Sequence, residues 1–74
     1  MKMIHNEAEM IAYLQSLHYK EQEAQRIEAQ INNETMVTGM SEHTYPLQVK
    51  LMSKGGPVLN IVLNNGVEWN YLLE

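Results

Sequence analysis

The sequence predicts an α+β domain in which a hairpin of two helices packs on one face of a three-stranded antiparallel β-meander. Three observations support this prediction: apolar residues recur at helical spacing before residue 33, they alternate with polar residues after residue 46, and two loops ending in glycine divide the alternating part. Because 74 residues leave room for only one hydrophobic core, we expect a single domain over residues 1–74.

The first helix is predicted over residues 6–17. Asn6 can cap its start, because an Asn side-chain oxygen accepts hydrogen bonds from the first free backbone amides, and Glu9 stands at the capping-box position three residues later. The apolar residues that follow keep the spacing of one helix face: Met10, Ile11, Leu14 and Leu17.

The second helix is predicted over residues 20–32. Its apolar residues are Ala24, Ile27 and Ile31. At ~100° per residue their stripe lies roughly a quarter turn from the first stripe, so one straight helix could not bury both. We therefore expect a break near His18 and Tyr19. The helix should end at Asn32 and Asn33, since Asn tolerates the left-handed conformation that closes helices.

The residues around this break resemble a known helical hairpin. The pattern Leu14-x-x-Leu17-His18-Tyr19-x-x-x-Glu23-Ala24-x-x-Ile27 is similar to the Leu-Gly-Tyr turn and Glu-Ala helix of ubiquitin-associated-type domains, over about a fifth of the chain. His18 occupies the place of the family's turn glycine, and strands stand where that family has a third helix. The resemblance therefore implies a helix-turn-helix hairpin and does not extend to the family's ligand-binding loop.

Residues 34–45 show no clear periodicity. A short extra strand can form at residues 35–38, and Gly39 with the polar residues before Pro46 indicates a loop. Three strands then follow, at about residues 47–52, 58–63 and 67–73.

The register of the sheet follows from the apolar residues of these strands, which are mostly odd-numbered. Odd positions of neighbouring strands share a face only if each connecting loop contains three residues, and the sequence provides such loops at Lys54-Gly55-Gly56 and Asn64-Asn65-Gly66. The rows predicted for the face under the helices are Leu47/Leu63/Val67, Val49/Ile61/Trp69 and Leu51/Leu59/Tyr71. The opposite face is polar or mixed except for one apolar row, made of Met52, Val58 and Leu72.

The composition excludes much of catalytic and metal chemistry. The chain has no Cys, and its nine acidic residues are all Glu, so cysteine nucleophiles, thiolate zinc sites and triads containing Asp are absent. The three histidines lack the spacing found in zinc hydrolases. We therefore expect no enzyme activity, no cofactor and no bound metal.

Charge and hydropathy limit the partners. The net charge of −4 disfavours binding to the phosphate backbone of nucleic acids. No apolar run approaches the roughly 20 residues that span a bilayer, and the first residues become polar and acidic too early for a secretion signal. We expect a cytoplasmic protein that binds neither nucleic acids nor membranes.

Two groups of residues are candidates for binding another protein. The apolar row Met52, Val58 and Leu72 needs a cover, which residues 36–40, a second copy of the chain or a partner protein can provide. The second candidate is the acidic surface of the second helix, with Glu21, Glu23 and Glu28. A homodimer is expected, because the chain is small and without disulfides and its last strand offers an open edge.

These features predict a non-catalytic regulator or inhibitor that acts by occupying a surface of another protein. Short acidic chains of this kind are typical of the accessory proteins of phages and mobile elements. The alternative is an oligomer that sequesters a small ligand, such as a metabolite or nucleotide signal, in a cleft lined by Tyr and Asn side chains.

Overall fold

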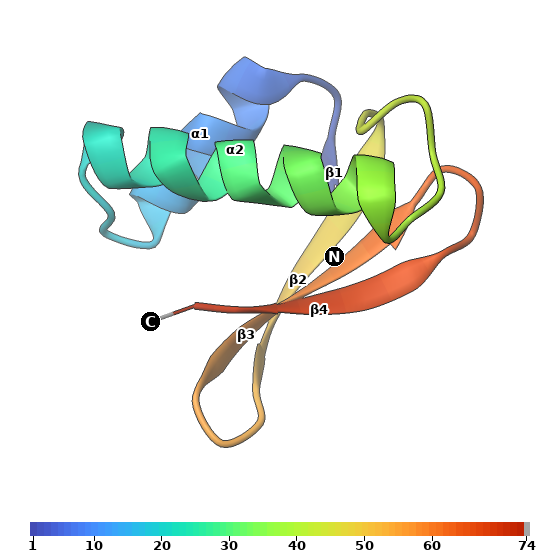
Figure 1. Ribbon diagram of the computed structural model, residues 1–74. Helices are drawn as coiled ribbons and strands as arrows, with labels where there is room; N and C mark the ends of the chain where they lie inside the picture. Colours follow the sequence, from blue (N-terminus) through green and yellow to red (C-terminus); the bar gives the residue numbers. More distant parts are fainter. Residues whose placement is uncertain (74) are drawn as a thin grey trace.

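Two helices lie on one face of a four-stranded antiparallel sheet in the computed structural model, which describes residues 1–73 (Figure 1). The strand order is β1-β2-β3-β4, so β1 and β4 are the edges. The elements in chain order are β1 (Lys2–Ile4), α1 (Glu7–Ser16), α2 (Glu21–Val37), β2 (Leu47–Ser53), β3 (Pro57–Leu63) and β4 (Glu68–Leu72). The predicted α+β class is confirmed, and the sheet has one strand more than the predicted meander.

The extra strand is N-terminal, so the prediction of a strand at residues 35–38 is wrong. β1 pairs with β2 in a register that sets Ile4 beside Leu47, and both side chains are buried in the core. Residues 35–37 belong to α2, which continues past the predicted end at residue 32. Thr35 accounts for this extension, because it follows Ile31 by about one helical turn and is buried on the same side of the helix.

The start of α1 is capped largely as predicted. The Glu9 backbone N–H donates to Asn6 Oδ1 at 2.9 Å. The Glu9 carboxylate reaches one residue further back than in a capping box and accepts a hydrogen bond from the His5 backbone N–H at 2.9 Å. This bond to His5 lowers the pKa of Glu9 below its usual value.

The turn between the helices has a residue with positive φ. His18 takes this conformation, with φ of 77°. Its N–H donates to the Gln15 carbonyl, and the Tyr19 N–H donates to the Leu14 carbonyl. Together these bonds form a Schellman motif, in which the position of His18 usually carries Gly. The break predicted near His18 and Tyr19 is therefore present.

The predicted register of the main strands is confirmed. Val49 pairs with Ile61, and Ile61 pairs with Trp69. On the opposite face the apolar row is aligned across the same three strands: Met52, Val58 and Leu72.

The loops of the meander are residues 54–56 and residues 64–66, since the Leu63 N–H already pairs with the Val67 carbonyl just before β4 begins. The two loops differ in conformation. Gly66 has φ of 89° and its N–H donates to the Leu63 carbonyl at 3.0 Å, as expected for a turn that ends in a left-handed residue. In the other loop both Gly55 and Gly56 have positive φ, at 70° and 141°. Only the loop ending at Gly66 thus matches the predicted geometry.

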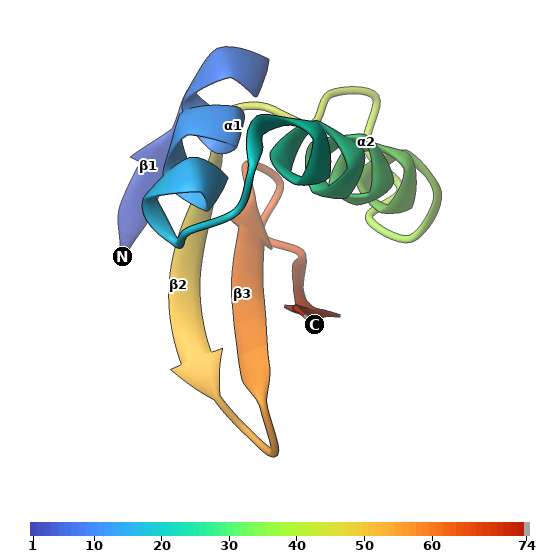
Figure 2. The same cartoon turned by 90° about the vertical axis from the view of Figure 1, so that its left-hand side faces the viewer.

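The helices cover one end of the sheet. Figure 2 shows α1 and α2 side by side over that end, whereas the β2–β3 hairpin extends beyond both helices. Leu51, on the helix-facing side near the hairpin tip, is therefore 47% exposed, although its cross-strand neighbour Leu59 is fully buried. The largest fully buried apolar side chains of the core include Ile4, Met10, Leu14, Ile31, Leu47 and Ile61.

Candidate functional site

The outer face of the sheet, opposite the helices, is uncovered by any other element of residues 1–73. Its apolar row runs across β2, β3 and β4. Leu72 is 60% exposed and Met52 is partly exposed, while Val58 between them is 7% exposed. The row is thus an apolar surface that is open on the side of β4.

Residues 36–40 do not cover this row. The three large apolar side chains of the segment are all exposed. The Gly39 carbonyl accepts a hydrogen bond from the Asn65 side chain at 3.3 Å, which places the segment beside the β3–β4 turn. Val58 lies at the other end of β3. The expectation that this segment folds over the row is therefore wrong, while a second copy or a partner protein stays a prediction.

A polar cluster lies beside the row on the same face. Asn60 is buried, and its Nδ2 donates to Glu68 Oε2 and to Asn70 Oδ1, both at 2.9 Å. The cluster binds the one carboxylate of residues 47–73, while Lys50 and Lys54 are exposed nearby. Because residues 1–46 hold seven of the nine Glu and three of the five Lys and Arg, the negative charge of the chain is concentrated around its helices.

The predicted acidic surface of α2 is smaller than the sequence indicates. Glu21 and Glu23 are exposed, and Glu23 pairs with Arg26 at 2.8 Å. Glu28 does not belong to this surface: its side chain is buried, at 6% exposure, and accepts a hydrogen bond from the Tyr45 hydroxyl at 2.6 Å. The placement of Glu28 with the two exposed carboxylates is therefore corrected.

The surroundings of Glu28 change its proton affinity. Burial raises the pKa of Glu28 above its usual value, and the Tyr45 hydrogen bond acts in the opposite direction. Burial and the Glu28 charge also raise the pKa of Tyr45, so this hydroxyl keeps its proton and can donate. The pair joins α2 to the loop before β2 and is an internal contact of the fold.

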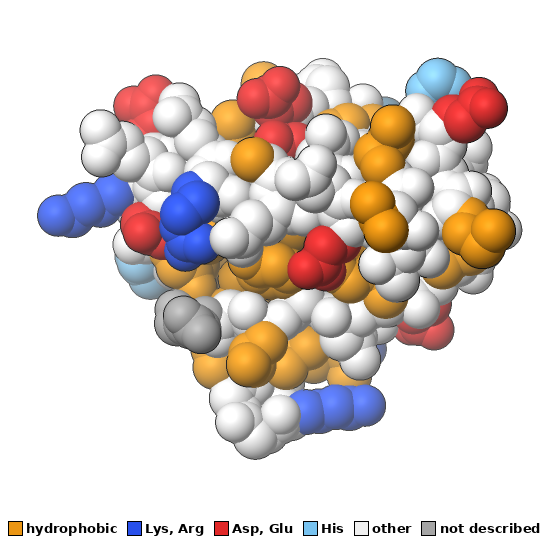
Figure 3. Space-filling model, in the orientation of Figure 1, with side chains coloured by type: hydrophobic (Ala, Val, Ile, Leu, Met, Phe, Trp, Pro, Cys, Tyr) orange, Lys and Arg blue, Asp and Glu red, His pale blue; other side chains and the backbone are white. Residues whose placement is uncertain are grey.

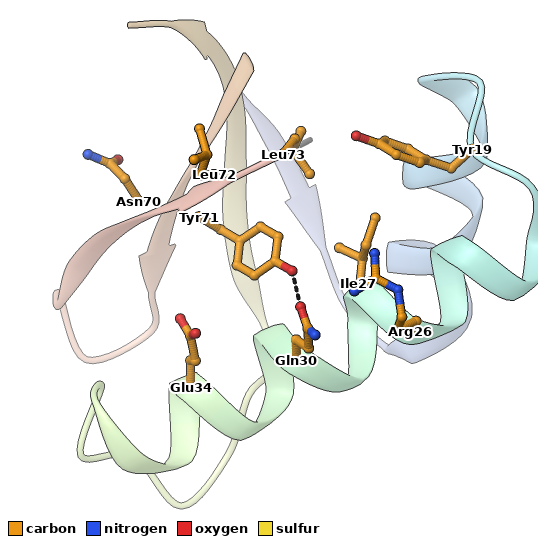
Figure 4. A pocket seen from close by; sticks show the side chains of 9 residues that line it. All are labelled: Tyr19, Arg26, Ile27, Gln30, Glu34, Asn70, Tyr71, Leu72 and Leu73. Atoms are coloured by element: carbon orange, nitrogen blue, oxygen red, sulfur yellow. Dashed lines mark hydrogen bonds between the residues drawn. The ribbon is translucent and has the colours of Figure 1, made fainter. Parts of the chain in front are cut away.

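A groove that the sequence analysis missed lies between α2 and the edge strand β4. Figure 3 shows hydrophobic side chains in this hollow, with basic and acidic side chains on its rim. Its volume is about 370 Å³, and Arg26, Gln30 and Glu34 line it from α2. In Figure 4, Tyr71 points from β4 toward α2 and its hydroxyl donates to Gln30 Oε1. The groove was not predicted because α2 was expected to end before Glu34.

The free edge of β4 borders this groove. The Leu63 N–H donates to the Val67 carbonyl and the Leu73 N–H to the Pro57 carbonyl, so odd-numbered residues of β4 turn their backbone groups toward β3. The backbone N–H and C=O groups of the even-numbered residues therefore face away from the sheet. These residues are Glu68, Asn70 and Leu72.

Residues 1–73 contain no group of three or more His or Glu side chains arranged to hold a metal ion. None of the helices in this range combines the length and apolar character that crossing a membrane requires. Comparison with protein-family models, with curated protein sequences and with solved structures gives no match.

Proposed function

We propose that this protein is a non-catalytic regulator or inhibitor that uses the outer face of its sheet to occupy a surface of another protein. The observation that carries the proposal is the apolar row Met52, Val58 and Leu72, which is aligned across three strands and lies on a face left open by the described chain. An apolar row surrounded by polar side chains is typical of a protein-binding surface.

The charges beside the row indicate the chemistry of the partner. Lys50, Met52 and Lys54 line one shallow depression on this face. The Glu68 carboxylate, which lines the same depression, is already hydrogen-bonded to Asn60. A partner that presents an apolar patch with acidic groups at its rim complements this surface, because the lysines would then meet opposite charges around a desolvated centre.

The test compares proteins retained from a lysate of the source organism by the wild type and by two variants. M52K/L72K places charges in the row, and V37K is the matched control, since Val37 is an exposed apolar residue outside the outer face. The specific partner should be retained by the wild type and V37K and lost from M52K/L72K. Because the two changes remove apolar contact area, calorimetric titration with the purified partner should give a Kd at least about tenfold higher for M52K/L72K than for the wild type. Equal binding by all three proteins would contradict the proposal.

The groove favours a second candidate, the sequestration of a small ligand. Tyr19, Tyr71 and Arg26 line it, which gives two aromatic surfaces and a cation within one hollow. Native mass spectrometry of protein from its source separates the candidates, because a co-purifying small molecule and a co-purifying protein add very different masses. A small ligand that is lost on the change R26A would favour the second candidate.

A further inference from the structure

We propose that the β4 edge and the groove beside it bind a second copy of this chain, so that β4 pairs antiparallel with β4 of the other copy and α2 lies against the other α2. The two proposed surfaces meet at β4, where Glu68, Asn70 and Leu72 turn their backbone groups to the edge. The dimer is therefore tested with changes on α2, which lies away from the outer face. Three features support this dimer: the difference between the two edges of the sheet, the self-complementary register of β4 and the order of charges along α2.

The two sheet edges differ in their ability to accept another strand. β1 has three residues and carries Lys2, and short strands and lysines protect edges from pairing. β4 has five residues, contains neither Pro nor Lys, and has its one carboxylate bound to Asn60. β4 is therefore the edge open to strand addition.

The register of β4 is complementary to itself. A twofold axis at Asn70 pairs Asn70 with its copy and Glu68 with Leu72 of the other chain. All three residues have backbone groups that face outward, so every outward N–H and C=O within the strand finds a partner. The two Glu68 carboxylates are then about 14 Å apart along the strands, beyond the physiological screening length of about 8 Å.

The same axis makes the facing sides of α2 complementary. Gln30 is joined to β4 through the Tyr71 hydroxyl, which places it above the centre of the strand (Figure 4). Arg26 and Glu34 lie four residues before and after Gln30 and line the groove on the same side of the helix. In an antiparallel pair of helices centred on Gln30, each Arg26 meets Glu34 of the other copy. Arg26 can serve this contact and its own Glu23, since a guanidinium has five N–H donors.

The area of the proposed dimer interface determines the affinity that we expect. α2 has 17 residues and is about 25 Å long, and the helix and sheet layers are each about 10 Å thick. The face therefore covers roughly 500 Å² per copy, or on the order of 1,000 Å² in total, at the lower end of specific interfaces. We expect a reversible dimer with a Kd in the micromolar range.

The test is a charge swap followed by analytical ultracentrifugation of the full chain from about 1 to 500 µM. R26E and E34R should each raise the dimer Kd roughly tenfold, because each change replaces two attractive contacts by repulsive ones. R26E/E34R restores opposite charges and should return the Kd to within about threefold of the wild type. E21R is the control, since Glu21 lies on the opposite side of α2 from Gln30 at ~100° per residue.

An NMR measurement tests the proposed β4–β4 register directly. In a dimer of isotope-labelled and unlabelled chains, the Hα atoms of Trp69 and Tyr71 of different copies should give a nuclear Overhauser contact, because these two residues form the close, non-hydrogen-bonded pair. A wild type that stays monomeric at about 500 µM would overturn the proposal. So would a dimer that is insensitive to the swap but dissociated by L72K, because it would use the outer face.

Discussion

Replacement of Tyr45 by Phe should destabilise the fold by about 2 kcal/mol at neutral pH, since a hydrogen bond to a buried charged group contributes roughly 1.5–3 kcal/mol. The 2.6 Å bond from the Tyr45 hydroxyl is the one hydrogen bond that the Glu28 carboxylate accepts among the described residues, and Glu28 is 6% exposed. The change Y45F removes this donor while keeping the aromatic ring. Urea unfolding followed by circular dichroism gives the loss directly, and the midpoint of thermal unfolding should fall by roughly 10 °C.

The pH dependence of this loss has a definite sign. Because burial raises the pKa of Glu28 above 4.5, protonation of Glu28 favours the folded state, and this contribution is lost as the pH rises through the folded pKa. Y45F removes an influence that lowers this pKa, so the pKa rises further. The penalty of Y45F should therefore shrink as the pH falls from 7 toward 4.

A double-mutant cycle isolates the contribution of the Glu28 charge to this hydrogen bond. In E28Q the amide oxygen can still accept from Tyr45 without a buried charge, so E28Q itself should be more stable than the wild type at pH 7. Y45F should then cost about 1 kcal/mol or less in the E28Q background. Equal penalties of Y45F in the wild-type and E28Q backgrounds would refute the reasoning, because positions 28 and 45 would then be uncoupled.

Three further changes are checked by the same urea titrations. T35V should stabilise the fold by about 1 kcal/mol, because the fully buried Thr35 hydroxyl has no hydrogen-bond partner among residues 1–73 and Val has the same shape; a loss of stability would mean that the hydroxyl is bonded. G39A should destabilise by about 1–3 kcal/mol, since a Cβ there would lie 2.4 Å from the Leu63 side chain and 2.7 Å from the Thr35 carbonyl oxygen; a neutral result would show that the loop shifts freely. H18G should stabilise by about 0.5–1 kcal/mol, because His18 is exposed and has φ of 77°; an unchanged midpoint would indicate that the left-handed conformation costs little at this position.

The sheet register could be predicted because it depends on one simple property, the parity of the apolar positions. Val49, Ile61 and Trp69 share a face only with three-residue loops, and the glycines mark those loops. The end of α2 could not be predicted in this way, because Asn32 and Asn33 favour a helix end locally, whereas burial of Thr35 against the core continues the helix. Tertiary packing outweighs local preference there.

The remaining features depend on contacts between distant residues. β1 has three residues, of which only Ile4 is buried, so the strand shows no recognisable alternation of apolar and polar residues. Glu28 resembles its acidic neighbours in the sequence, and its partner Tyr45 is 17 residues away. The groove exists because α2 continues to Val37 and lies beside β4, and neither feature could be recognised from the sequence. The apolar row was visible from the sequence, since it follows from the same register as the core.

The β2–β3 hairpin that extends beyond the helices should divide the sheet into a slowly and a rapidly exchanging part. Backbone amides near Val49 lie under the helices and should exchange with deuterium only when the whole chain unfolds. Amides near Leu51 and Ser53 should exchange through local opening, because none of residues 51–53 is buried. Met52 belongs to this rapidly exchanging part. A protein bound to the outer face would therefore slow deuterium uptake at the hairpin while leaving the amides under the helices unchanged.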